Sequence, residues 1–102
     1  MYARMAQFEG VNVEVAKRTM DEADAILRPL MQALPGYAGE LMLVSPGGRF
    51  VAITLFDTQA NAEAAEPTFD QEMPEKLGHL FKEWAGTRTS VERFEVAVDD
   101  RA

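Results

Sequence analysis

The chain has 102 residues, which is the size of one small domain. Its formal net charge is −7, so it lacks the basic balance that is typical of nucleic-acid-binding proteins. It contains no cysteine, which excludes disulfides, thiolate nucleophiles and cysteine metal sites. Hydrophobic residues make up 47% of the sequence, which is enough to build a folded core.

Neither a targeting segment nor a membrane span is visible in the sequence. The stretch 1–8 is too short and too polar for the apolar region of a signal peptide. No apolar run approaches the ~20 residues that a membrane helix needs. We therefore expect a cytoplasmic protein with neither a membrane nor a nucleic acid as partner. We expect one domain over residues 1–102, with 99–102 as a polar tail.

The first half of the chain predicts a strand and then a helix. The apolar segment 2–9 has the length and content of a strand. In the segment 13–34, apolar residues recur three and four positions apart, which places them on one side of a helix. Asn12 precedes this helix as its expected N-cap. Pro29 removes a helical hydrogen bond, so we expect a kink or a break beside it.

A β-hairpin is predicted in the middle of the chain. Two apolar runs, 38–45 and 49–56, flank the turn sequence Pro46-Gly47-Gly48. Both sides of the second strand are largely apolar, which is typical of a strand that is covered on both faces. One side carries Val51, Ile53 and Leu55, and the other carries Phe50, Ala52, Thr54 and Phe56.

The second half predicts two helices and a last strand. Asp57 and Thr58 are suitable N-cap residues for a short alanine-rich helix over 59–66. A longer helix is expected over 69–84, because its apolar residues again follow one helical stripe. The segment 91–98 alternates between apolar and polar residues and predicts a strand.

The order of these elements is β-α-β-β-α-β, which predicts a ferredoxin-like α+β sandwich with one antiparallel sheet and both helices on one face. The other face would be apolar and uncovered. Because leaving apolar surface in water costs about 25 cal/mol per Å², we expect a second copy to pack against it in a homodimer. The residues expected on the uncovered face are Phe50, Ala52, Thr54 and Phe56, together with Tyr2, Ala6 and Phe8.

The segment Leu34-Pro35-Gly36-Tyr37-Ala38-Gly39, followed by a strand, a glycine turn and residues 51–62, resembles the antibiotic biosynthesis monooxygenase family of dimeric α+β barrel proteins. In that family a Leu-Pro-Gly-aromatic joint leads into the hairpin, and the third strand ends in an aromatic residue and an acidic cap. The resemblance implies a homodimer with a pocket in each subunit between the sheet and its helices. Family members include cofactor-independent oxygenases of aromatic or quinol substrates, haem-degrading oxygenases, and proteins with no established reaction.

His79 is the only histidine and bears on the haem alternative. A haem-degrading member would supply an axial histidine from the helix before the last strand, which is where His79 lies. However, His79 follows Leu77 by two positions and so points away from the apolar stripe. The chain also has alanines where such a member would carry a tryptophan in the short helix. A solvent-facing His79 is the simpler interpretation, and haem degradation is the less favoured function.

Several polar and aromatic side chains are candidates for a site. Arg4, Thr54 and Arg93, with Glu95, interrupt otherwise apolar strands, so each is either paired or exposed, or is aimed into a cavity where it orients a ligand oxygen. Tyr37 and Trp84 either pack in the fold or contact a ligand, Tyr37 as a hydrogen-bond donor and Trp84 by stacking on a flat ring. We find no phosphate-binding loop and no metal-ligand cluster.

Two functions follow as hypotheses. The first is a homodimeric oxygenase-family protein that binds a small planar, apolar or quinonoid ligand and needs no cofactor. Its candidate catalytic residues are Arg4, His79 and Arg93, and its candidate pocket residues are Tyr37, Thr54 and Trp84. The alternative is a non-catalytic dimeric module that binds a ligand or a partner. A cavity reached by Arg4, Thr54 or Arg93 favours the first hypothesis, and a pocket filled by Phe50, Phe56, Met5 or Trp84 favours the second.

Overall fold

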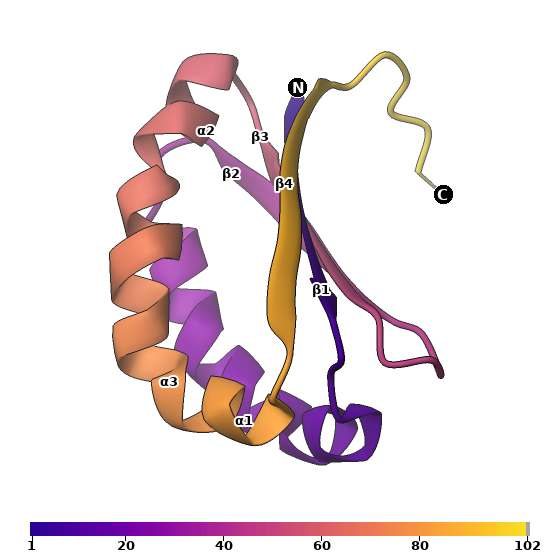
Figure 1. Cartoon of the computed structure of the whole chain (residues 1–102). Helices are drawn as coiled ribbons and strands as arrows, with labels where there is room; N and C mark the ends of the chain where they lie inside the picture. Colours follow the sequence, from indigo (N-terminus) through magenta and orange to yellow (C-terminus); the bar gives the residue numbers. More distant parts are fainter. Residues whose placement is uncertain (102) are drawn as a thin grey trace.

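The computed structural model describes residues 1–101 and confirms the ferredoxin-like α+β fold. Its four strands form one antiparallel sheet in the order β2-β3-β1-β4, and all helices lie on one face of it (Figure 1). The elements are β1 (Tyr2–Glu9), α1 (Val13–Gln32), β2 (Tyr37–Val44), β3 (Phe50–Phe56), α2 (Gln59–Ala64), the π-helical segment η1 (Thr68–Glu72), α3 (Met73–Trp84) and β4 (Thr87–Glu95).

Of the kink or break expected beside Pro29, the break is wrong, because α1 runs unbroken through this residue. Proline cannot bond to the carbonyl four residues earlier, which belongs to Ala25. Both residues are exposed, so water can satisfy that carbonyl and the helix continues. The predicted cap is confirmed, since the Asn12 side chain accepts a hydrogen bond from the backbone N–H of Val15 at 3.3 Å.

The joint between α1 and β2 explains part of the sequence resemblance in structural terms. Gly36 has a φ of 76°, a conformation that favours glycine. A Cβ atom at this position would collide with the side chain of Asp57, which follows β3. The backbone N–H of Asp57 donates to the carbonyl of Gly36 at 2.9 Å. The glycine of the joint and the acidic residue after β3 therefore form one contact.

Three elements in the second half differ from prediction in their bounds. The short helix expected over 59–66 ends at Ala64 in α2. The helix expected from residue 69 becomes regular only at α3, and η1 precedes it as a wider π-helical turn. Pro74 has no N–H, and its ring would crowd the carbonyl of Asp70 in a normal α-helical turn, which accounts for the widening. The last strand was expected over 91–98, but β4 starts earlier and ends at Glu95.

The alternation of β3 was predicted correctly, but its two sides were assigned to the wrong faces. Phe50, Thr54 and Phe56 lie under the helices and are 6%, 1% and 0% exposed. Tyr2, Ala6, Phe8 and Ala52 share that face through the strand register. The open face instead carries Val51, Ile53 and Leu55, flanked by Leu41, Leu43 and Phe94, which are 54%, 49% and 45% exposed.

The error has a physical reason: both sides of β3 are apolar, so its pattern alone does not indicate which side the helices cover.

The segment after β4 runs on the open side of the sheet (Figure 1). Its first backbone contact is the N–H of Val96 with the carbonyl of Met1 at 2.9 Å. Within residues 1–101, none of the helices combines the length and the hydropathy that crossing a bilayer requires.

Candidate functional site

A cavity of about 450 Å³ lies between the sheet and the helices. Its size falls in the range of small-molecule sites, which is roughly 300 to 1,000 Å³. Side chains from all four strands and from α1, α3 and η1 line it, and most of them are apolar. The strand register divides the sheet side of the cavity into three successive rows of side chains, and each row has a different chemical character.

The middle row provides the empty space. Ala6 of β1 lies opposite Ala52 of β3, and Met42 of β2 continues the row. Alanine has the smallest side chain that a strand normally carries, so the two central strands leave room at this level. Ala23 and Leu27 of α1 close the space from the helix side. The cavity thus follows from two alanines placed side by side in the centre of the sheet.

The row on one side of the alanines is aromatic. Phe50 lies 5.8 Å from the ring of Phe8 and 5.8 Å from the ring of Trp84, and Phe81 lies 5.5 Å from Trp84. Trp84 is held in place because its indole N–H donates to the hydroxyl of Thr19 at 2.8 Å. All four rings border the cavity, so this end offers faces and edges on which a flat ligand can pack.

The row on the other side is polar. Glu40, Thr54, Arg4 and Arg93 lie directly opposite one another on four neighbouring strands, from β2 to β4. The Thr54 hydroxyl donates to the Glu40 carboxylate at 3.4 Å. Arg4 and Thr54 are only 4% and 1% exposed, and both line the cavity with Glu40. One end of the cavity therefore presents a carboxyl, a hydroxyl and a guanidinium in one line.

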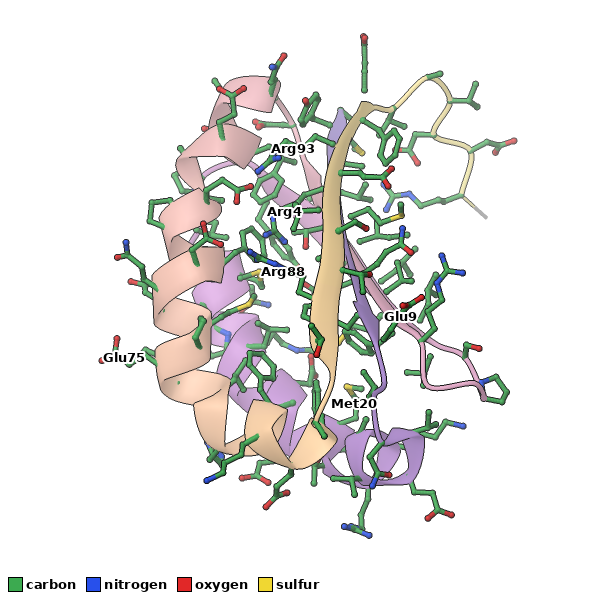
Figure 2. All side chains as sticks on the ribbon, in the orientation of Figure 1. Arg4, Glu9, Met20, Glu75, Arg88 and Arg93 are labelled. Atoms are coloured by element: carbon green, nitrogen blue, oxygen red, sulfur yellow. The ribbon has the colours of Figure 1, made fainter. Side chains whose placement is uncertain are left out.

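Arg4 is buried but paired. Its Nε donates to Glu66 at 3.1 Å, and the same oxygen of Glu66 lies 2.8 Å from Nη2 of Arg93 in a salt bridge. The guanidinium also lies 3.9 Å from the centre of the Phe69 ring. Burial lowers the pKa of Arg4 below its usual value, while Glu66 acts in the opposite direction. Figure 2 shows Arg4, Arg88 and Arg93 between the sheet and the helical layer.

Glu40 lies in a different environment. Burial raises the pKa of its carboxyl to about 7, the hydrogen bond from Thr54 opposes this shift, and the nearby charge of Asp24 adds to it. No salt bridge to Glu40 occurs among residues 1–101. Glu40 also borders a second hollow, of about 420 Å³, between β2 and α1. It is a partly buried carboxyl that can change its protonation state near neutral pH.

A bulge in β4 turns Arg88 toward the cavity. Gln7 of β1 pairs with Ser90, but the next residue, Phe8, pairs with Arg88, so Thr89 is the extra residue. The Thr89 hydroxyl donates to the carbonyl of Gln7 at 3.3 Å. Without the bulge Phe8 would face Thr89, and Arg88 would point to the open face.

Arg88 lies at the mouth of the cavity. Its side chain is 47% exposed, and its Nη1 is 3.4 Å from a carboxylate oxygen of Asp70 in η1. Both residues line the cavity. A contact between the edge strand and the π-helical turn thus borders the cavity opening.

The structure brings together only part of the predicted site. Arg4, Thr54 and Trp84 line the cavity. Arg93 belongs to the polar row but contacts Glu66 rather than the cavity. Tyr37 borders the second hollow, beside Glu40.

His79 lies outside the cavity and is exposed, with its Nε2 3.4 Å from Glu22. A haem in the cavity would therefore have no histidine on its walls, so these residues do not fit a histidine-ligated haem. Among residues 1–101, no group of three or more His, Asp or Glu residues could hold a metal ion.

Sequence reasoning missed Glu40, Glu66, Asp70 and Arg88. A signal for Glu40 was present, because it is the only charged residue in the strand sequence of 37–44. Glu66 and Asp70 lie in a helical region whose acidic residues normally face water. Arg88 had no visible signal, since its orientation depends on the pairing of β4 with β1.

Comparison with solved structures identifies similar folds over nearly the whole chain. A dimeric ferredoxin-like protein from an uncultured marine organism has a TM-score of 0.75 and 11% identity, covering 99% of this chain and 98% of that protein. A candidate antibiotic biosynthesis monooxygenase from Bordetella bronchiseptica has a TM-score of 0.67 and 17% identity, covering 95% and 97%. A mutant of MhuD with two manganese protoporphyrin IX molecules bound per active site has a TM-score of 0.64 and 19% identity, with full coverage of both chains.

No family profile and no curated protein sequence matches this chain. The similarity to these structures therefore lies in the backbone fold, because the sequence identities are below 20%. The fold of this chain is that of the antibiotic biosynthesis monooxygenase proteins and the dimeric ferredoxin-like proteins, as its sequence predicted.

Proposed function

We propose that this protein is a homodimer that binds a small planar, apolar or quinonoid molecule in the cavity of each subunit and oxidises it with molecular oxygen, without a metal or a flavin. The observation that carries the proposal is the pairing of an aromatic end with a polar row across one cavity. A fused-ring molecule with one oxygen substituent matches this division, because its rings pack on aromatic side chains while its oxygen reaches hydrogen-bond donors.

The proposed chemistry uses the polar row in two ways. A quinol must lose a proton before its ring reacts readily with oxygen, and a carboxylate can accept that proton. The resulting negative oxygen is stabilised by a hydroxyl and a guanidinium, which Thr54 and Arg4 provide. One oxygen atom then enters the ring, and the other leaves as water with two hydrogens of the substrate, which supplies all the electrons. The apolar walls keep bulk water away from the reactive anion.

The homodimer is supported by the open face of the sheet. It carries large aliphatic side chains and Phe94, with Leu41 54% exposed in the isolated chain. Fully burying a large apolar side chain contributes about 1.5–3 kcal/mol, and a two-fold axis uses every such residue twice. One protein of similar fold is described as dimeric. Two open faces packed together would place the cavities on the outer sides of a two-sheet core.

The test uses Trp84, which is the only tryptophan and lies on the cavity wall. We expect 1,4-dihydroxynaphthalene or anthrone to change its fluorescence in a saturable way, and to be consumed with oxygen uptake above the rate without protein. Hemin should produce no histidine-type shift in its absorption spectrum. Saturable binding without oxygen uptake would overturn the oxidation and leave the non-catalytic binding module. The absence of both signals would overturn the proposal.

A further inference from the structure

Glu40 occupies a position that the proposed oxidation can use. It starts the polar row on β2, opposite Thr54, and Arg4 follows Thr54 on the next strand. A ligand oxygen above Thr54 would therefore have a carboxyl on one side and a guanidinium on the other. Glu40 also borders the second hollow, so it forms part of the wall shared by both spaces.

The other carboxylates around the site are already occupied by cations. Glu66 forms salt bridges with both Arg4 and Arg93, and Asp70 forms one with Arg88. Among residues 1–101, the only side-chain hydrogen bond to Glu40 comes from the Thr54 hydroxyl, at 3.4 Å. A carboxyl has lone pairs for further donors, and it lines the cavity. The geometry thus leaves Glu40 as the acceptor that a ligand can reach.

The charges around Glu40 come from each element packed against it. On α1, Asp21, Asp24 and Arg28 border the second hollow with Glu40, and on β2 Tyr37 borders the same hollow. Arg28 is paired with Asp24.

These neighbours include no free cation facing Glu40, which agrees with the raised pKa of its carboxyl, about 7. On β3 it faces the Thr54 hydroxyl, and Arg4 lies two strands away. The carboxylate form is then present above neutral pH and is not neutralised by a partner.

We propose that Glu40 is the proton acceptor of the cavity, and that the ligand is a hydroxyaromatic molecule whose O–H points to Glu40 while its oxygen faces the guanidinium of Arg4. This inference rests on the proposed function and names the substrate class for it. The proton passes from the ligand oxygen to a carboxylate oxygen of Glu40. The electron pair of the O–H bond stays on the ligand oxygen, whose negative charge is stabilised by Arg4.

The test compares two ligands that differ only at this proton. 2-Naphthol can donate to Glu40, and 2-methoxynaphthalene cannot. Their affinities for the full-length protein are measured through Trp84 fluorescence between pH 5 and pH 8, where the naphthol itself stays neutral. We expect naphthol binding to tighten about tenfold as the pH rises through about 7, because the carboxylate accepts a charge-assisted hydrogen bond. 2-Methoxynaphthalene should bind equally at all pH values.

Glu40→Gln keeps the size of the side chain but cannot become a carboxylate. We expect this variant to bind naphthol about tenfold more weakly at pH 8 and to lose the pH dependence, with unchanged binding of 2-methoxynaphthalene. Glu75→Gln is the matched control, because Glu75 points outward from α3 (Figure 2) and its loss should change neither ligand. Carbon-13 NMR of the Glu40 carboxyl in the wild-type protein gives a second measurement, and naphthol should shift its titration.

The outcomes separate this inference from the proposed function. Two results would overturn the role of Glu40 but leave ligand binding by the wild-type protein intact. In the first, Glu40→Gln weakens the binding of both ligands equally. In the second, the affinity for naphthol changes neither with pH nor with the substitution. If neither naphthalene binds to the wild-type protein, both proposals fail. If naphthol binding depends on Glu40 but quinols cause no oxygen uptake, the hydroxyaromatic site stands and the oxidation fails.

Discussion

The two faces of the sheet are built from the same four strands but have opposite shapes. On the open face, β3 presents Val51, Ile53 and Leu55, which are branched aliphatic residues of similar size. On the covered face, the same strand presents a large aromatic, a small alanine, a hydroxyl and another large aromatic in succession. Side chains of equal height make an even surface that suits another sheet. Side chains of unequal height leave a hollow, and the cavity lies there.

Side-chain size, as well as polarity, separates the proposed interface from the proposed binding site in this fold. Both faces are rich in apolar residues, so polarity alone does not distinguish them. Ala6 and Ala52 lower the middle of the covered face, while Thr54 and Arg4 introduce polar atoms beside the gap. We expect changes on the open face to affect association and changes on the covered face to affect ligand binding.

The largest effect should come from a charge on the open face. Leu41→Asp places a carboxylate in the proposed interface, and the two-fold axis places it there twice. We expect the dimer dissociation constant to rise by at least about 100-fold, since each buried leucine contributes about 1.5–3 kcal/mol. Analytical ultracentrifugation measures this. Leu41 is 54% exposed in the single chain, so the monomer should stay folded.

Ala25→Asp is the control for this experiment, because it adds the same charge at an exposed position of α1. It should sediment as the wild-type protein does. A wild-type protein that is monomeric at micromolar concentration, or a Leu41→Asp variant that is as dimeric as the wild type, would contradict the assignment of the open face.

A smaller effect is expected from filling the hollow. Ala52→Leu places a larger side chain in the middle row of the cavity, opposite Ala6. We expect the affinity for 2-methoxynaphthalene to fall about tenfold or more, because the new side chain occupies the ligand's space, while the dimer is retained. Ala60→Leu makes the same substitution at an exposed position of α2 and should leave the affinity unchanged. Unaltered ligand binding in Ala52→Leu would place the site elsewhere.

The smallest effect concerns stability and pH. The pKa of Glu40 is about 7 in the folded chain against an ordinary value of 4.5, so the folded state holds this proton more strongly than the unfolded state. The free energy of unfolding should therefore decrease as the pH rises from about 4.5 to about 7. Relative to Glu40→Gln, we expect the wild type to lose on the order of 1–2 kcal/mol between pH 5 and pH 8, allowing for partial contact with solvent.

Urea unfolding at both pH values and one protein concentration measures this loss, because the proposed dimerisation would make stability depend on concentration. If the unfolding free energies of the wild type and of Glu40→Gln change in parallel with pH, the pKa of Glu40 is not raised in the folded state.

Local signals in the sequence predicted most of the fold. The cap of α1, the hairpin turn and the helical stripes each depend on a few neighbouring residues, and all are found in the structure. The assignment of the faces failed because it depends on which side the helices pack, and both sides of β3 are apolar. The unbroken helix at Pro29 depended on exposure, which sequence spacing does not reveal.

The candidate site was less predictable, because it combines residues from distant segments. Arg4 and Thr54 were recognised as polar residues in apolar strands, and the same reasoning applied to 37–44 would have found Glu40. The pairing of Glu66 with Arg4 joins positions 62 residues apart. Arg88 faces the cavity only because of the bulge opposite Gln7 and Phe8. No periodicity within one strand encodes a shift in its pairing with another.

The bulge in β4 also bears on how such a protein can diverge. Insertion of a single codon between Thr89 and Ser90 would place Thr89 opposite Phe8 and move Arg88 to the open face, leaving the polar row beyond it in register. The chemistry of the cavity opening would then change in one genetic step, while the buried rows kept their neighbours. Edge strands can accept such insertions and deletions more readily than central strands, because only one side of their hydrogen bonding must adjust. The side chains at this opening can thus be exchanged by changes in strand length as well as by substitution.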